Sequence, residues 1–429
     1  MVEISWFSVI ERQLSVNSGN CLIEFQFADL HNLPIIPQCK RRIEIGRMEA
    51  HVELNGFQGK VTIHEPVLRY PGNPILTCHD VNKVWGTDGR LYTYTVHNAG
   101  MAEMTGENGK HQTIMLFRSH IADGRSVIGK AVSDNGLNSW GVDPRPFLLP
   151  AAESDLYAEG VDINSVIESE AGGVEDMRVN PVGSGLYVLT YSAYHEQIPD
   201  RVKVMMALTR DFESVVRYGP ISEQDMRNVV IFPEPDRNKK WVALLRPNDK
   251  AREVSGSGHI GGSFAEICAG FAPSPTGPWE IGNVILRSGH GPSAFQAKIG
   301  PGAPPIRTRY GWLNIFHGVR STMAGNPYTL GVAFHDLEDP TNPSKIRISA
   351  KPLLMPSASD CSVRETDYVH VLNIVFCCGA LTGQDDTVAI YYSGNDTVMN
   401  VGLANIQILN EMCDVFRFNP LTGQHLYSL

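Results

Sequence analysis

Two adjacent carboxylates and a nearby arginine are the residues of this sequence best placed to do chemistry. Glu175 and Asp176 are followed, after one residue, by Arg178. Adjacent side chains on a strand point to opposite faces, so we expect only one carboxyl to face a site, with Arg178 on the same face as Asp176. The guanidinium there could stabilise the carboxylate or contact an anion. A carboxyl beside a sugar can act as a general acid on a departing glycosidic oxygen, and a surface salt bridge is the structural alternative.

The overall charge limits the possible partners. The 429 residues include 36 Lys and Arg against 46 Asp and Glu, a net charge of −10. This balance argues against nucleic acid or an anionic membrane as a partner, so a site for an anion must be a local cluster of basic residues. We find neither a run of roughly 20 apolar residues that could span a membrane nor the pattern of a secretory signal at the amino terminus.

The cysteines favour a reducing compartment. The eight cysteines are scattered, with no C-x-x-C pair and no His at ligand spacing, so no metal site or bound cofactor is predicted. Cys377 and Cys378 lie in an apolar strand-like run, and we interpret them as small buried hydrophobic residues. We therefore expect a cytoplasmic protein.

The elements that must position these residues are mostly strands. Short apolar or alternating runs bounded by Gly, Pro, Asn and Asp predict strands. The clearest runs are residues 112–117, 185–191, 203–208, 240–245, 311–317 and 387–392. Short helices are expected only near Asp155 and at residues 222–228. The predicted fold class is all-β.

A degenerate repeat in the sequence also predicts how these strands are arranged. A small-residue strand, a turn and a closing strand recur five times, beginning at Gly129, Ala207, Gly270, Gly331 and Gly402. Each unit has room for four strands and their loops, which predicts a five-bladed β-propeller. A two-sheet sandwich is the alternative fold, but it would not require the same sequence motif to recur five times. We expect residues 1–65 to form a β-rich extension suited to oligomer contacts, and residues 66–429 to form the propeller domain.

Several segments, in order over roughly residues 66–407, resemble glycoside hydrolase family 130, a family of β-mannoside phosphorylases and β-mannosidases. Residues 172–179 are similar to its G-x-E-D-P-R-[IV] signature, with Met177 in place of the usual Pro. Residues 73–76 match its Asn-Pro-Ile-Leu phrase. Further similar segments are residues 98–100, 115–118, 123–129, 232–234, 245–247, 298–308, 311–313, 316–319, 336–340, 373–380 and 391–397.

The resemblance implies a sugar site. It makes Asp176 the proton donor of the catalytic domain, with the proton relayed through a mannose hydroxyl. Polar side chains expected around the sugar are Asn98, Glu175, Arg178, His317 and Asp396. Tyr191 or Tyr194 could stack on a sugar ring, and for His317 a place in the core is the alternative.

Phosphorolysis would also need a phosphate site. Arg118, Arg227 and Arg246 are the candidates, because a guanidinium binds phosphate oxygens in a bidentate fork. The family's phosphorylases usually carry a Lys-Asp pair before the Phe-Pro-Glu phrase and a His before the Arg-Pro pair. Here Arg227 and Asn228 precede the first phrase, and Leu245 stands where the His is expected. Family members that lack phosphate ligands are hydrolases.

The predicted function is inverting phosphorolysis of β-mannosides, with phosphate as co-substrate and α-mannose 1-phosphate as product. The alternative is an inverting β-mannosidase in which Glu234 or Glu266 activates a water, at a carboxyl separation of roughly 6.5–9.5 Å. A non-catalytic glycan-binding propeller is the second alternative. A homo-oligomer is compatible with all three.

Overall fold

Strands are the main secondary structure of the protein, whose structure is a computed structural model. It describes residues 48–86, 89–105, 109–197, 202–248, 252–253, 263–289, 293–323, 325–365 and 367–426. The predicted mostly β class is confirmed, and each of the six strand segments singled out in the sequence lies within or overlaps a strand. Many strands are buried on both faces, as in Gly311–Val319, where all nine residues are buried. This explains why their sequences are apolar runs rather than strict alternations.

The first sheet consists of two groups of strands that meet at one point. The first group is β4 (His97–Thr105), β5 (His111–His120), β6 (Ser126–Ser133) and β7 (Gly141–Val142). The second is β9 (Gly173–Pro181), β10 (Tyr187–Tyr194), β11 (Val202–Thr209), β12 (Val216–Pro220) and β8 (Leu156–Tyr157). The groups join through a parallel pairing of Ser126 with Gly173. A side chain at position 173 would approach the Ser126 backbone nitrogen to 2.8 Å, so this close approach requires glycine.

Three further sheets follow along the chain. One contains β13 (Met226–Ile231), β14 (Trp241–Pro247), β17 (Ile267–Ala272) and β18 (Glu280–Leu286). The next contains β19 (Lys298–Pro301), β20 (Ile306–Thr308), β21 (Gly311–Val319), β22 (Tyr328–His335), β23 (Arg347–Ser349) and β27 (Arg417–Phe418). The last contains β24 (Val375–Thr382), β25 (Thr387–Gly394), β26 (Val398–Asn405) and β3 (Leu68–Arg69). A separate two-stranded ribbon is formed by β15 (Arg252–Glu253) and β16 (Ser263–Phe264).

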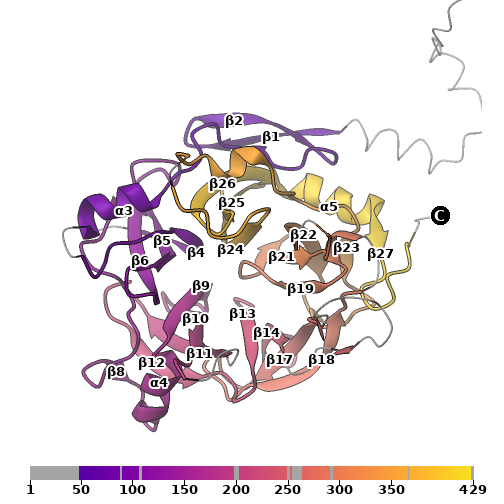
Figure 1. Cartoon of the computed structure of the whole chain (residues 1–429). Helices are drawn as coiled ribbons and strands as arrows, with labels where there is room; N and C mark the ends of the chain where they lie inside the picture. The colour runs from indigo at the N-terminus through magenta and orange to yellow at the C-terminus, as the bar shows by residue number, and fades with distance from the viewer. Residues whose placement is uncertain are drawn as a thin grey trace, which may run out of the picture. The chain divides into compact units, whose positions relative to one another are not determined.

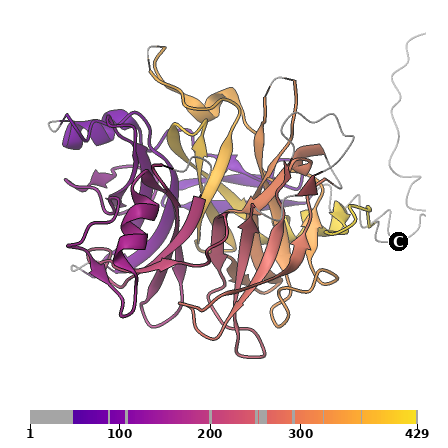
Figure 2. The same ribbon diagram turned by 60° about the horizontal axis from the view of Figure 1, so that its bottom comes forward.

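The sheets are arranged around a common centre, with β4, β9, β13 and β24 closest to it (Figure 1). Contacts run from β24 to β4, from β4 to β9, from β9 to β13 and from β13 to β19. The early strand β3 pairs with β26 near the end of the chain, which joins the two ends of this arrangement. Figure 2 shows the sheets from the side, with loops emerging beyond the strand ends. Loops at one end of these inner strands can therefore converge on a single site.

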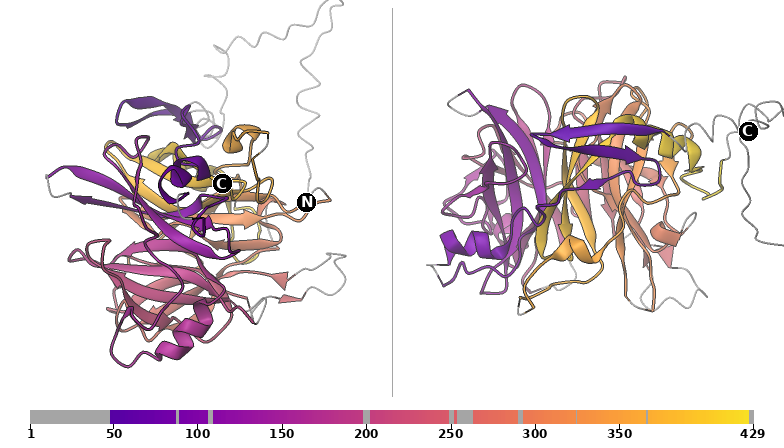
Figure 3. Two further views of the ribbon diagram at one scale, coloured as in Figure 1. Left: turned by 60° about the vertical axis from the view of Figure 1, so that its left-hand side comes forward. Right: turned by 90° about the horizontal axis from the view of Figure 1, so that it is seen from above.

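Residues 48–65 form a hairpin on the outside of the last sheet. Its strands are β1 (Glu49–Leu54) and β2 (Phe57–Thr62), and the hairpin lies across the strands of the last sheet in the right-hand view of Figure 3. Val52 and Val61 are buried in the same hydrophobic cluster as Val388 of β25. The described part of the predicted extension is thus β-rich, and residues 1–47 lie outside the described residues.

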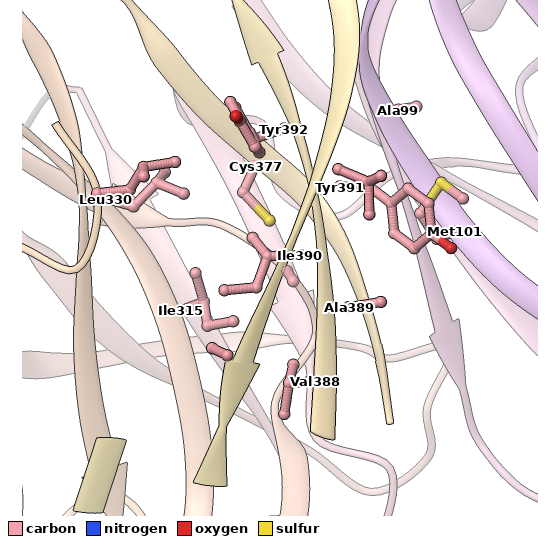
Figure 4. Packing of buried hydrophobic residues seen from close by; sticks show 14 of the residues in the cluster. Ala99, Met101, Ile315, Leu330, Cys377, Val388, Ala389, Ile390, Tyr391 and Tyr392 are labelled. Carbon is pink, nitrogen blue, oxygen red and sulfur yellow. The ribbon is translucent and has the colours of Figure 1, made fainter. Parts of the chain in front are cut away.

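The largest hydrophobic cluster fills the space between β4, β24, β25 and β21. Figure 4 shows Met101 of β4, Tyr391 and Ile390 of β25, and Ile315 of β21 converging there. Cys377 packs among them, and Cys377 and Cys378 are both fully buried. Their interpretation as small buried hydrophobic residues is confirmed. Cys21 and Cys39 lie outside the described residues.

Helices are few, and the sequence located them only in part. They are α3 (Cys78–Trp85), α4 (Ile163–Glu170) and α5 (Ile406–Val415), with the short turns η3 (Ser293–Phe295) and η4 (Ala358–Cys361). The expected helix at residues 222–228 is wrong, because β13 begins at Met226. Helix α5 was missed because it follows β26 directly; the Asn405 side chain accepts from the Gln407 nitrogen at 3.0 Å and starts the helix. None of the described helices is long and apolar enough to cross a membrane.

Candidate active site

Asp176 lies at an irregularity in β9 that changes the direction of its side chain. Glu175 pairs with Ser192 and Arg178 with Thr190, so two residues of β9 oppose one residue of β10. Asp176 has a φ of 51°, outside the strand region. The Arg178 side chain donates to the Asp176 backbone carbonyl at 2.6 Å and thereby holds this bulge.

Because of the bulge at Asp176, the carboxyls of Glu175 and Asp176 both contact the guanidinium of Arg118. Arg118 on β5 donates through Nη1 to Asp176 Oδ1 at 3.1 Å and through Nη2 to Glu175 Oε1. Ser126, brought close by the β6–β9 pairing, donates to the same Glu175 oxygen at 2.8 Å. The prediction that only one carboxyl could face the site is wrong, because the bulge at Asp176 breaks the alternation of the strand.

A third carboxyl joins this group from the turn between β25 and β26. Asn395 and Asp396 both have positive φ, as in a tight hairpin turn. Asn98 links this turn to β9, since its Nδ2 donates to Asp176 Oδ1 at 2.9 Å and its Oδ1 accepts from Ser393 at 2.7 Å. We refer to Glu175, Asp176 and Asp396 as the carboxyl cluster.

The three carboxyls differ in their tendency to ionise. Burial raises the pKa of Asp396 to about 7, and the negative charges of Asp176 and Glu175 act in the same direction. Burial also raises the pKa of Glu175, against the attraction of Arg118. For Asp176 burial is outweighed by Arg118, Arg178 and the hydrogen bond from Asn98, so its pKa lies below the usual range. Within the cluster, Asp396 and Glu175 therefore retain a proton to higher pH than Asp176 does.

A group of cations lies on β9, β13, β14 and β19. Arg227 and Arg246 pair directly across β13 and β14, which places two like charges side by side. Burial and the Arg227 charge lower the pKa of Arg246 to about 10, and the Arg178 charge acts in the same direction. Burial, Arg246 and Arg227 likewise lower the pKa of Lys298. We refer to Arg178, Arg227, Arg246 and Lys298 as the cation cluster.

In the described part of the chain, the cation cluster makes no direct ion pair with a carboxylate. Among the described residues, none of its four members has a carboxylate oxygen within 4.0 Å, although Arg246 and Arg178 are only 7% and 1% exposed. His317 of β21 is fully buried beside it, with Nε2 3.2 Å from Arg246 Nη1. Burial and the Arg246 charge hold the pKa of His317 well below its usual range, so this imidazole is neutral and accepts from Arg246. Unbalanced buried cations make a favourable site for an anion.

The structure divides the predicted residues between these two groups. Asp176, Glu175, Asp396 and Asn98 lie together, and His317 lies with Arg227 and Arg246. Arg118, predicted as a phosphate ligand with Arg227 and Arg246, instead lies in the carboxyl cluster. Its guanidinium is taken up by two carboxylates, and this was not visible in the sequence because residues 118 and 176 are far apart along the chain.

Tyr191 does not lie at the site. Its side chain is 1% exposed, and its hydroxyl donates to the buried Glu170 of helix α4 at 2.7 Å. A buried ring offers no face to a sugar, so the expected stacking role of Tyr191 is corrected. The alternative, Tyr194, is partly exposed, and the Arg227 guanidinium lies 5.1 Å from its ring centroid.

The carboxyls considered as water-activating bases are engaged elsewhere. Glu234 is exposed and lies 3.4 Å from Arg307. Glu266 is buried and lies 3.5 Å from Arg287. The residue that sequence reasoning missed is Lys298, although it begins one of the segments that resemble the family. The sequence could not show that Lys298 lies beside Arg246, because β19 approaches β14 only in the folded chain.

Taken together, the geometry places a cluster of three carboxyls, which differ in pKa, beside a cluster of four cations. The model of glycoside hydrolase family 130, described as beta-1,4-mannooligosaccharide phosphorylase, matches residues 84–417. The chain therefore belongs to glycoside hydrolase family 130.

Characterised relatives agree with this assignment. The chain is 27% identical over 359 residues to a β-1,2-mannobiose phosphorylase of Listeria innocua, covering 80% of the chain and 88% of the relative. It is 28% identical over 360 residues to a 4-O-β-D-mannosyl-D-glucose phosphorylase of Bacteroides fragilis, covering 81% and 83%. Among solved structures, the Listeria innocua β-1,2-mannobiose phosphorylase in complex with β-1,2-mannobiose superposes with a TM-score of 0.62 at 25% identity, covering 81% of this chain and 99% of that one.

Proposed function

We propose that this chain catalyses the inverting phosphorolysis of β-mannosides, releasing α-mannose 1-phosphate and a shortened sugar. The observation that carries the proposal is the cation cluster: Arg178 and Arg246 are buried, no member has a carboxylate oxygen within 4.0 Å among the described residues, and the cluster adjoins the carboxyl cluster. A hydrolase has no use for such an anion site, whereas a phosphorylase needs one for its co-substrate. The names of the relatives, phosphorylases acting on mannobiose and mannosylglucose, support the same reaction.

In this proposal Asp396 transfers a proton to Asp176 when the sugar binds, and Asp176 then delivers it through a sugar hydroxyl to the departing glycosidic oxygen. Asp176 is ionised in the free protein, and the neighbouring Asp396, with a pKa of about 7, holds the proton of the coupled cluster. Asn98 contacts the Asp176 carboxylate and lies between these carboxyls. Arg118 positions Asp176 and Glu175 rather than binding phosphate.

Phosphate is assigned to the cation cluster. Arg227 and Arg246 supply guanidinium donors, Lys298 adds a third charge, and neutral His317 orients Arg246. Phosphate is its own nucleophile, so this reaction requires no carboxylate to activate a water. The ion pairs made by Glu234 and Glu266 fit that requirement.

The architecture that supports this site is proposed to be a five-bladed propeller. The blades would be β4–β7; β8–β12; β13, β14, β17 and β18; β19–β23 with β27; and β24–β26 with β3. Residues 66–429 would form this catalytic domain and residues 1–65 an extension outside it. A homo-oligomer and a cytoplasmic location stay predictions.

The test is a phosphate-dependence assay with β-1,2-mannobiose, β-1,4-mannobiose and 4-O-β-D-mannosyl-D-glucose. Cleavage should require phosphate and should yield α-mannose 1-phosphate, identified by NMR. Arg246→Ala should raise the KM for phosphate at least about 10-fold, with a much smaller effect on the KM for the sugar, because a charge-assisted hydrogen bond is lost.

Arg307→Ala is the matched control. It removes an exposed guanidinium from β20, outside the cation cluster, and should leave both KM values unchanged. Release of free mannose in phosphate-free buffer at an undiminished rate would reject phosphorolysis and favour the hydrolase.

A further inference from the structure

Each nitrogen of the Arg118 guanidinium has a polar neighbour. Nη1 donates to Asp176, Nη2 donates to Glu175, and Nε donates to the Ser126 hydroxyl at 3.3 Å. Nη2 carries a second hydrogen, and Nε2 of His120 lies 2.8 Å from this nitrogen. Because arginine has no acceptor, His120 must accept through Nε2 and carry its own proton on Nδ1. His120 therefore completes the set of acceptors around this guanidinium.

The backbone of His120 is fixed at the end of β5. Its nitrogen donates to the Thr95 hydroxyl at 3.2 Å. Its carbonyl accepts from the Tyr94 nitrogen at 2.9 Å and from the Thr93 hydroxyl at 2.9 Å. His120 follows Arg118 by two residues on the same strand, so both side chains lie on one face of the sheet. The strand thus sets where the imidazole lies relative to the guanidinium.

Two further histidines pack against the ring of His120. The ring centroids of His97 and His370 lie 5.2 Å and 4.5 Å from that of His120, and both contacts are edge-to-face. His97 lies on β4 and is fully buried. The backbone nitrogen of His370 donates to the Thr397 hydroxyl at 2.9 Å, one residue beyond Asp396. The imidazole of His120 is therefore held between β4 and the turn that carries the third carboxyl.

The imidazole of His120 stays neutral and can accept near neutral pH. Burial, the Arg118 charge and His370 lower the pKa of His120 to about 3, against the attraction of Asp176. Burial and Arg118 also lower the pKa of His370, and they hold the pKa of His97 well below its usual range. At neutral pH all three rings are therefore uncharged, and the charged groups that act on His120 are Arg118 and Asp176.

The acceptor on His120 affects how Arg118 is shared between two carboxyls. A guanidinium often binds a single carboxylate through two parallel hydrogen bonds. Here Nη1 and Nη2 contact different carboxyls, and the second hydrogen of Nη2 is directed at His120. Without this acceptor a buried N–H would be unsatisfied, and the guanidinium would turn to place two donors on one carboxylate. Its contact with Asp176 is longer than its contact with Glu175, so the contact with Asp176 is the one expected to be lost.

We propose that His120 is a positioning residue for the carboxyl cluster, because it accepts from Arg118 and keeps the guanidinium shared between Glu175 and Asp176. The kinetic consequence rests on the proposed function, whereas the sharing of Arg118 is a property of the folded protein alone. The Arg118 charge acts to lower the pKa of Glu175, Asp176 and Asp396. The position of Arg118, and hence His120, therefore influences the pH at which the cluster loses its proton.

The test compares two amides of different length at position 120. In His120→Gln the amide oxygen reaches about as far as Nε2 and can accept from Arg118, whereas the shorter side chain of His120→Asn cannot reach it. With the mannoside that the wild-type protein cleaves fastest, His120→Asn should lower kcat about 10-fold and change the KM for the sugar less than about twofold, because a charge-assisted hydrogen bond is lost. His120→Gln should retain at least about half of the wild-type kcat.

The pH profile of kcat/KM adds a measurement that a purely structural role would not change. A weaker contact with Arg118 raises the pKa of Asp176, so the cluster keeps its proton to higher pH. The basic limb of the profile should therefore move upward by about half a pH unit or more in His120→Asn and stay in place in His120→Gln. His111→Leu, which removes an exposed imidazole from the other end of β5, is the control and should change neither kcat nor the profile. Thermal melts of each variant verify the fold.

Crystal structures of the two amide variants supply a measurement that needs no activity. Arg118 should contact both Glu175 and Asp176 in His120→Gln, and only one of them in His120→Asn. Arg118 bound to both carboxyls in His120→Asn, an equal loss of kcat in the two variants, or an unshifted basic limb in His120→Asn would overturn the positioning role. If Arg118 moves as expected but cleavage does not require phosphate, or no mannoside is cleaved, the positioning role stands and phosphorolysis fails.

Discussion

The surroundings of the Asp176 carboxyl shift its pKa in opposite directions. Burial disfavours its charge, while Arg118, Arg178 and Asn98 favour it strongly enough to lower the pKa. Asp176 would therefore need a proton from a neighbouring group to act in the proposed role of general acid. Asp396, with a pKa of about 7, is the neighbouring carboxyl suited to supply it.

Asp176→Asn should lower kcat for β-mannoside cleavage by about 10²–10⁴-fold, because the amide cannot transfer the proton. The fold should be unchanged, since Arg118 keeps its contact with Glu175 and the bulge keeps its backbone contact with Arg178. Steady-state kinetics together with a thermal melt measure both effects. Asp134→Asn, at an exposed carboxyl outside the cluster, is the control. Activity within a few-fold of wild type would remove Asp176 from the mechanism.

At the scale of single elements, β19 shapes the cation cluster by approaching it closely. Gly300 pairs with His317 of β21. A Cβ atom at position 300 would lie 2.5 Å from Cε1 of His317 and 3.0 Å from Cδ of Arg246. The strand can therefore pass this point only without a side chain, and the positions of His317 and Arg246 depend on it.

Gly300→Ala should raise the KM for phosphate roughly 10-fold, because His317 and Arg246 must shift and their hydrogen bonds to the anion weaken. The KM for the mannoside should change much less. Gly141→Ala on β7 is a matched control, since its added Cβ meets its nearest atom at 3.7 Å. Equal phosphate KM values for the two variants would show that β19 does not set the anion site.

At the scale of the whole molecule, the early strand β3 is anchored to the last sheet by a buried ion pair. Arg69 donates to Asp360 through Nε at 2.7 Å and through Nη2 at 3.1 Å. Asp360 is 2% exposed and also accepts from the Tyr392 hydroxyl at 2.9 Å. Segments nearly 300 residues apart in the sequence are joined here.

Arg69→Ala should lower the free energy of unfolding by about 2 kcal/mol, because it leaves a buried carboxylate without its cation. The value is at the lower end for buried pairs because the Arg69 side chain is 33% exposed. Urea unfolding measures the change. Lys60→Ala, which breaks an exposed pair with Glu49, should leave stability unaltered. If the unfolding curve of Arg69→Ala coincides with that of the wild type, this pair does not anchor β3.

The mostly β class, the six clearest strands, the family and the segment that carries Glu175 and Asp176 were all predicted correctly from the sequence. These follow from local information, namely short apolar runs, turn residues and a contiguous signature. The contact of both carboxyls with Arg118 could not be predicted, because the bulge at Asp176 depends on how β9 pairs with β10. The burial of Tyr191, and the presence of Lys298 rather than Arg118 in the cation cluster, likewise emerged only in the folded chain. Each of these outcomes depends on which distant strands meet at the centre, and no spacing along one strand contains that information.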